Sequence, residues 1–204
     1  QDLAVAVIGG VVLAENKAQR EFVVRTVLAT SDDTMSLAAA DYDQDGRLDL
    51  YVCAYYPTMT GLTGGRGGIA AAGEQFVYHD ANDGGANHLF RNTQTDEKLW
   101  LFEDVTDASG MNANNRRYSF AASWEDYDND RDLDLYVAND FGRDNLYRND
   151  NGRFTDVAKD AGAEDSGSGM AITWGDYDRD GWMDAYVSNM FSAAGRRVTA
   201  QSEF

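Results

Sequence analysis

Residues Phe120–Phe141 have the sequence FAASWEDYDNDRDLDLYVANDF, and two other segments of the chain align with them without gaps. These are Met35–Tyr56 (MSLAAADYDQDGRLDLYVCAYY) and Met170–Phe191 (MAITWGDYDRDGWMDAYVSNMF). Each segment has alternating apolar residues before an Asp-rich centre and a short apolar run after it. Alternation with a period of two predicts a β-strand with one buried face, and the short run predicts a strand buried on both faces. We therefore expect a strand, an Asp-rich loop and a second strand in each segment.

A second repeated unit lies between these segments. Asn87–Asn92 (NHLFRN) matches Asp144–Asn149 (DNLYRN), and Phe102–Gly110 (FEDVTDASG) matches Phe154–Gly162 (FTDVAKDAG). The chain thus repeats roughly every 50 residues, with four short strands in each repeat. This pattern is typical of β-propeller blades, whereas the repeats of a β-solenoid are shorter.

The repeats predict an all-β chain that forms one β-propeller domain over residues 1–204. We expect three four-stranded blades, at about 1–56, 87–141 and 142–191, with an inter-blade insertion loop at 57–86. Closed propellers have about four to eight blades, so we expect the chain to be part of a larger propeller of about seven. Three blades alone would leave exposed sheet edges.

Composition excludes several classes of protein. The chain has 17 Lys and Arg against 35 Asp and Glu, and its net charge is −18, so it lacks the cations that nucleic acids and anionic membrane surfaces require. Its 43% hydrophobic residues are ample for a packed core. The longest apolar run, Leu3–Ala14, contains two glycines. It is shorter than the roughly 20 residues of a membrane span, so we expect no membrane insertion. A strand pair is favoured there over a signal-peptide remnant, because no basic segment precedes the run.

The Asp-rich loops carry carboxylates at loop positions 1, 3, 5 and 9, and the backbone carbonyl at position 7 can add another oxygen. Ca²⁺ takes about six to eight oxygen ligands in flexible geometry, whereas Mg²⁺ requires a stricter octahedron. The predicted calcium ligands are Asp41, Asp43, Asp45, Arg47 and Asp49 in the first loop; Asp126, Asp128, Asp130, Asp132 and Asp134 in the second; and Asp176, Asp178, Asp180, Trp182 and Asp184 in the third.

Position 12 distinguishes these loops from an EF-hand, which needs a bidentate Glu there and a helix on each side. Here the residues at position 12 are Val52, Val137 and Val187. Solvated acidic turns without a metal are the other interpretation, but so many crowded carboxylates would repel one another strongly without a cation. Arg131 replaces glycine at position 6 of the second loop, where a left-handed backbone costs a non-glycine residue about 1 kcal/mol. We expect up to three Ca²⁺ ions, with the first and third loops favoured over the second.

The Asp loops, the Leu-Tyr-Arg-Asn strand and Phe-Thr-Asp-Val resemble FG-GAP/VCBS-type repeats, which form the calcium-bearing propellers of integrin alpha subunits and many secreted bacterial proteins. Tyr186–Gln201 (YVSNMFSAAGRRVTAQ) is also similar to the propeller region of cartilage acidic protein-like, ASPIC/UnbV-associated sequences. The resemblance covers about residues 22–201, apart from the insertion and a degenerate first unit at Phe22–Leu28. It implies a secreted or periplasmic binding, adhesion or assembly role, with calcium as a structural ion.

Residues that commonly perform catalysis are few. His79 lies in the insertion, His88 lies in a predicted repeat strand, and the single cysteine, Cys53, lies in a predicted buried strand. We therefore expect a non-enzymatic module that binds a protein or a glycan. One alternative is a propeller-fold enzyme, such as a polysaccharide lyase or a dehydrogenase, with catalytic residues mostly outside this segment. Another is an accessory subunit of a larger assembly.

Three aromatic residues end the strands that leave the Asp loops. They are Tyr56, Phe141 and Phe191. Together they would form either an aromatic binding surface on one face of the propeller or hydrophobic plugs between neighbouring blades.

Overall fold

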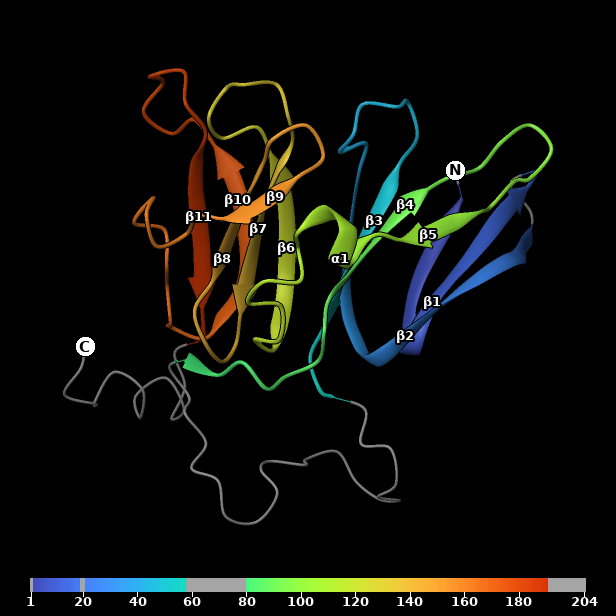
Figure 1. The fold of residues 1–204 in the computed structure, drawn as a ribbon, viewed down its shortest axis with the longest axis horizontal. Helices are drawn as coiled ribbons and strands as arrows, with labels where there is room; N and C mark the ends of the chain where they lie inside the picture. Colours follow the sequence, from blue (N-terminus) through green and yellow to red (C-terminus); the bar gives the residue numbers. More distant parts are fainter. Residues whose placement is uncertain (1, 19–20, 58–79, 191–204) are drawn as a thin grey trace, which may run out of the picture.

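The computed structural model describes residues 2–18, 21–57 and 80–190 of the 204-residue chain. These ranges form three antiparallel sheets that stand side by side in chain order (Figure 1). The curled, nearly all-β arrangement is that of a β-propeller segment, so the predicted fold class is confirmed. The helix in the described ranges, α1 (Thr106–Ser109), has four residues, and no helix there could cross a lipid bilayer.

The first sheet contains five strands. They are β1 (Leu3–Lys17), β2 (Glu21–Ala40), β3 (Asp49–Ala54), β4 (His88–Asn92) and β5 (Phe102–Asp104), paired in that order. The first half of β2 pairs with β1, and its second half pairs with β3. The apolar run Leu3–Ala14 therefore lies within one strand and is not a strand pair. Gly9 has a φ of 76° and the register shifts beside it, so the strand is irregular at this point but does not reverse.

The second sheet is one complete repeat. Its strands are β6 (Ser119–Glu125), β7 (Asp134–Asn139), β8 (Asn145–Asn149) and β9 (Phe154–Asp156), paired in that order. The last four strands of the first sheet follow the same order, as the sequence predicts. The third sheet contains β10 (Gly169–Gly175) and β11 (Asp184–Asn189), the two strands that flank its Asp loop.

The sheets begin at a different point of the repeat from the predicted blades, about 1–56, 87–141 and 142–191. Hydrogen bonds join each Leu-aromatic-Arg-Asn strand to the strand that leaves the preceding Asp loop, so β4 pairs with β3 and β8 with β7. Connection length accounts for this pairing in the second blade, because five residues separate β7 from β8 and twelve separate β9 from β10; in the first blade the same pairing forms across the insertion, with 33 residues between β3 and β4. Short connections favour adjacent antiparallel strands. Each blade therefore starts with the two strands around its Asp loop.

The core lies between neighbouring sheets. Tyr51 and Cys53 of β3 belong to the same buried cluster as Leu135 and Val137 of β7, and Cys53 is a core residue as predicted. On the other face of the first sheet, the β1–β2 hairpin covers the blade. Val11, Leu13 and Leu28 of the hairpin pack there against Leu50, Val52 and Phe90.

One aromatic contact recurs between consecutive blades. The ring of Tyr51 meets that of Trp124 edge-on at a centroid distance of 6.4 Å. The matching pair at the next interface, Tyr136 and Trp174, is also edge-on, at 6.1 Å. A tyrosine on the strand leaving one Asp loop is thus covered by a tryptophan on the strand entering the next loop.

Aromatic side chains also fill the edge of the first interface opposite the Asp loops. Phe141 packs against a buried cluster that contains Tyr55 and Tyr118, with ring centroids 5.5 Å from Tyr118. Tyr56 lies at the rim of this cluster, with its ring 4.7 Å from that of Tyr55. This packing favours the interpretation of Phe141 as a plug between blades. Phe191 and most of the 57–86 insertion lie outside the described residues.

Candidate metal centres

The three Asp loops lie along one edge of the molecule, at the top in Figure 1. Each connects the first two strands of its blade: residues 41–48 join β2 to β3, residues 126–133 join β6 to β7, and residues 176–183 join β10 to β11. The repeated sequence thus places three chemically similar loops side by side.

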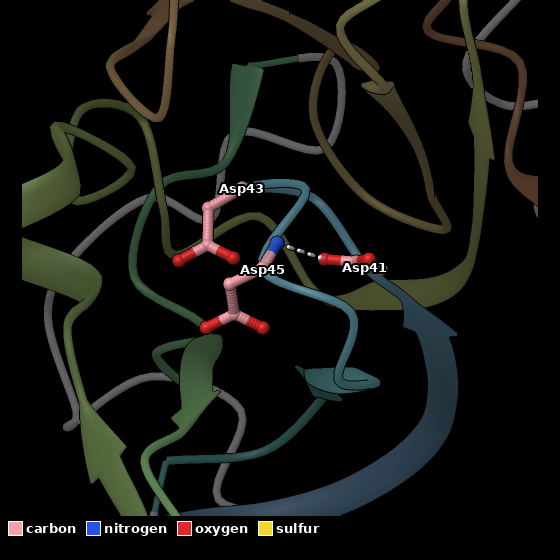
Figure 2. A group of neighbouring side chains, drawn as sticks. All are labelled: Asp41, Asp43 and Asp45. Carbon is pink, nitrogen blue, oxygen red and sulfur yellow. Dashed lines mark hydrogen bonds between the residues drawn. The ribbon is translucent and has the colours of Figure 1, made fainter.

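The position-1 carboxylate closes each loop. Asp41 accepts hydrogen bonds from the backbone N–H groups of Asp45 and Gly46, each at 2.9 Å; Figure 2 draws the first of these. Asp126 and Asp176 accept the same two bonds in their own loops. Because both donors come from the turn itself, this carboxylate fixes the loop conformation.

Two positions of each loop have a left-handed backbone. At position 6, φ is 85° at Gly46, 80° at Arg131 and 92° at Gly181. Arg131 therefore adopts the left-handed conformation that the sequence predicted for this position. Position 4 is also left-handed, with φ of 57° at Gln44, 59° at Asn129 and 64° at Arg179. Position 4 was not anticipated, because glutamine and arginine carry no signal for that conformation.

Three carboxylates converge in each loop. Ligand oxygens lie within 4.8 Å of one another in the groups Asp41, Asp43 and Asp45; Asp126, Asp128 and Asp134; and Asp176, Asp178 and Asp184. Figure 2 shows the first group. One predicted carboxylate stays outside each group, namely Asp49, Asp130 and Asp180 in turn. The structure thus brings together most of the carboxylates predicted for each loop, and the members at positions 1 and 3 are constant.

The position-9 carboxylate has a second role that the sequence analysis missed. Asp49 is fully buried and accepts the N–H of Asn92 in β4 at 2.7 Å and that of Tyr42 at 3.3 Å. Asp134 accepts the matching N–H of Asn149 in β8 at 2.8 Å and the position-2 N–H at 3.2 Å. Burial raises the pKa of Asp49 to about 6 and that of Asp134 to about 7. This residue therefore clamps the loop to the Leu-aromatic-Arg-Asn strand.

The position-7 residues keep their loops in shape through the backbone. The N–H groups of Arg47, Asp132 and Trp182 donate to the position-5 carboxylates at 3.0, 2.8 and 2.9 Å. The Asp132 carboxylate accepts hydrogen bonds from the Gln44 side chain at 3.0 Å and from Asn151 N at 2.7 Å. Asp132 therefore bridges the first and second loops.

A further bond ties the first two blades together. The Asn149 side-chain amide donates to the carbonyl of Tyr42 in the first loop at 3.0 Å and to that of Leu133 in the second at 3.1 Å. One asparagine of β8 thus holds both loops at the inter-blade boundary.

Arginine side chains approach the first carboxylate group. Arg91 Nε lies 2.6 Å from an oxygen of Asp43, and Arg47 forms an ion pair with Asp45. Arg148, which matches Arg91 in the second blade, pairs with Asp150 at 2.9 Å. No carboxylate in the described part of the chain lies within ion-pair distance of the Arg131 guanidinium. Local positive charge is therefore greatest at the first group.

The donor set fits a hard divalent cation. All ligand atoms are oxygens, which Ca²⁺ prefers. One carboxylate oxygen of Asp43 and one of Asp128 are buried without a hydrogen-bond partner, and such atoms are costly unless a cation or water pairs with them. Burial and the charge of Asp130 raise the pKa of Asp128, a shift that a bound cation would oppose.

A protein-family model described as FG-GAP-like repeat matches residues 1–52 and 126–187. The two ranges contain 52 and 62 residues, which is more than half of the 204-residue chain. The chain belongs to the FG-GAP-like repeat family. The matched ranges of this FG-GAP-like repeat protein include all three Asp loops, but β6, the strand that enters the second loop, lies outside them. No curated protein matches the chain.

Proposed function

We propose that this FG-GAP-like repeat protein is a calcium-stabilised β-propeller segment that binds a protein partner outside the cytoplasm. The convergence of three carboxylates in the Asp loop of each of three repeats, always including positions 1 and 3, supports calcium binding. The repeat family, whose propellers are generally interaction modules, supports a binding role. FG-GAP repeats occur in extracellular proteins, which supports a location outside the cytoplasm.

The groups that would hold the ions are Asp41, Asp43 and Asp45; Asp126, Asp128 and Asp134; and Asp176, Asp178 and Asp184. A bound Ca²⁺ would neutralise the carboxylates of its loop and stabilise the turn. The position-1 aspartate already orders the turn through two backbone hydrogen bonds, and the position-3 aspartate supplies an oxygen that has no other partner in the first two loops. These three groups contain nine of the 27 aspartates of the chain, so a third of its aspartates would be calcium ligands.

The proposed role is non-enzymatic. His88 Nδ1 lies 2.7 Å from Asp104, and the imidazole stacks on Phe90 at a centroid distance of 5.6 Å, which supports a structural role for this histidine. His79 lies outside the described residues. A glycan in place of a protein partner, and membership of a larger complex, are outcomes of the tests below.

Thermal unfolding with Ca²⁺ and with EGTA tests the metal. Calcium at 100 times its dissociation constant should stabilise the chain by about 2.7 kcal/mol. A triple variant with Asp43, Asp128 and Asp178 changed to Asn should lose the response, whereas Asp150→Asn, outside the three groups, should keep it. An unchanged midpoint of the native chain in EGTA would exclude calcium as a structural ion.

Two assays test the binding role. Calcium-dependent capture of one protein at fixed stoichiometry supports it, and a glycan array identifies a carbohydrate ligand instead. If the native chain cleaved acidic polysaccharides and the His79→Ala variant did not, the chain would be a lyase and the proposed binding role would be wrong.

A further inference from the structure

We propose that Arg91 sets the calcium affinity of the first Asp loop by acting as an internal cation there, so that the second loop binds Ca²⁺ more tightly than the first. This inference rests on the proposed function and ranks two of its three sites. It reverses the order expected from the sequence, in which Arg131 at position 6 made the second loop the less favoured one.

Two arginines face the converging carboxylates of the first loop. Arg91 Nε lies 2.6 Å from Asp43 Oδ2, and a second nitrogen of the same guanidinium lies 3.4 Å from Asp45 Oδ2. Arg47 forms an ion pair with the same oxygen of Asp45, and its Nε donates to the carbonyl of Asn92 at 2.9 Å. The side chains of Asp43 and Asp45 are 15% and 16% exposed, so solvent screens these charges only in part. Two of the three carboxylates of this group are therefore already paired with positive charge.

The second loop has no such internal cation. Arg148 matches Arg91 in the repeat, but its Nη2 lies 2.9 Å and its Nε 3.3 Å from an oxygen of Asp150. The first blade has Thr93 at the position of Asp150, so no carboxylate at that position holds Arg91 away from the loop. Among the described residues, no cationic side chain lies within ion-pair distance of the three converging carboxylates of the second loop.

Loop position 7 increases the contrast, because Arg47 of the first loop is replaced by Asp132 in the second. Hydrogen bonds from the Gln44 side chain and from Asn151 N hold the Asp132 carboxylate beside the second loop. A nearby negative charge strengthens the binding of a cation, and a nearby positive charge weakens it. The charges around the second loop therefore favour Ca²⁺ more than those around the first.

Arg91 also competes directly for a ligand atom. Asp43, at position 3, belongs to the first group of converging carboxylates. One of its oxygens is buried without a hydrogen-bond partner, and the other faces Arg91. Full use of this carboxylate as a ligand requires the Arg91 contact to break, whereas Asp128 in the second loop has no ion pair to lose. As the calcium concentration falls, the first loop should lose its ion before the second.

Two chains of residues 1–204 separate the sites. One carries Asp128→Asn with Asp178→Asn and keeps the position-3 carboxylate only in the first loop. The other carries Asp43→Asn with Asp178→Asn and keeps it only in the second. In calorimetric titration with Ca²⁺ the second-loop chain should bind about tenfold more tightly, the order of effect expected when a unit charge lies within a few ångströms of a divalent ion.

Variants of the arginines identify the cause. Arg91→Met in the first-loop chain should tighten calcium binding about tenfold, whereas the matched control Arg148→Met in the second-loop chain should leave it unchanged. Thr93→Asp copies the acceptor of the second blade and should also tighten binding in the first-loop chain. In a first-loop chain that already carries Arg91→Met, Thr93→Asp should have little further effect, which separates removal of Arg91 from the loop from the added negative charge.

Thermal unfolding in EGTA provides a second readout. Arg91→Met should lower the midpoint of the calcium-free chain, because two carboxylates lose a counter-charge, although its calcium affinity rises. A merely structural role of Arg91 would instead lower both stability and affinity. Equal affinities of the two single-loop chains, or an unchanged affinity in Arg91→Met, would overturn this inference and leave the proposed calcium binding intact. If neither chain bound Ca²⁺, the proposed function itself would be wrong for these loops.

Discussion

The second and third blades share a loop with the same residues at positions 1, 2, 3, 5 and 9 but differ in what surrounds it. The second loop is clamped by β8 through Asp134 and Asn149, and Tyr136 beside it is buried beneath Trp174. The third loop keeps the same internal hydrogen bonds, although Tyr186 is exposed and β11 has no outer neighbour among the described residues. The local sequence is thus sufficient for the loop, whereas the core requires the adjacent strands and blade.

The two blades should differ most in how much stability is lost when their matched tyrosines, Tyr136 and Tyr186, are removed. Tyr136→Ala removes a buried ring and the hydroxyl that donates to Asp144, and should lower the free energy of unfolding by about 4 kcal/mol. Tyr186→Ala should lower it by less than about 1 kcal/mol, because the side chain is mostly exposed. Urea denaturation of both variants measures the contrast. Similar losses would show that the two blades contribute equally to stability.

A smaller effect on stability is expected from the titration of Asp144. This residue precedes β8 and accepts the Asn139 N–H at 2.7 Å. Burial raises its pKa to about 7, against about 3.9 in an unfolded chain. The native state therefore keeps a proton that the unfolded state has released, and stability falls as pH rises from about 4 to about 7.

Asp144→Asn should remove this contribution, which is about 2 kcal/mol between pH 5 and pH 7. Asparagine is the residue that the first blade has at the matching position, Asn87. Denaturation at several pH values in EGTA measures the slope, and Asp150→Asn should leave it unchanged. An unaltered slope in Asp144→Asn would assign the pH dependence to other carboxylates.

The smallest effect concerns the contact between loops. Gln44 bonds to the second loop through the carbonyl of Arg131 and the carboxylate of Asp132, so Gln44→Met should cost about 1 kcal/mol. Arg179→Met changes the matching left-handed position of the third loop, where the described residues provide no such contact, and should be neutral. Calcium-free thermal unfolding compares the two. Equal shifts would indicate that loop 1 and loop 2 are not coupled through Gln44.

The sequence was sufficient to predict the features that repeat locally. The strands around each loop, the left-handed backbone at Arg131 and the convergence of the position-1 and position-3 carboxylates all depend on residues within one turn. The four-strand composition of a blade also follows from the spacing of the motifs. Calcium binding and the extent of the complete propeller stay predictions.

The features that were not predicted depend on which strands become neighbours. The predicted blade boundaries differ from the observed ones, because the repeated sequence alone does not show that β8 pairs with β7, the strand that precedes it in the chain. The clamping role of Asp49 depends on Asn92, which is distant in sequence. The approach of Arg91 to Asp43 is also a tertiary contact. The sequence predicted that Arg131 could pair with a loop carboxylate, because it lies within the motif, whereas in the structure Arg47 and Arg91 form ion pairs with aspartates of the first loop.

The bond from Asn149 to Tyr42 has a consequence for the order of folding during synthesis. The two residues are 107 positions apart, so the first loop can complete its contacts only after most of the second blade has left the ribosome. Contacts of such long range slow folding and leave unfinished sheets exposed meanwhile. The first loop therefore cannot form this contact until β8, the third strand of the second blade, has been synthesised. A pause in translation before residue 149 would leave the contacts between the two blades incomplete.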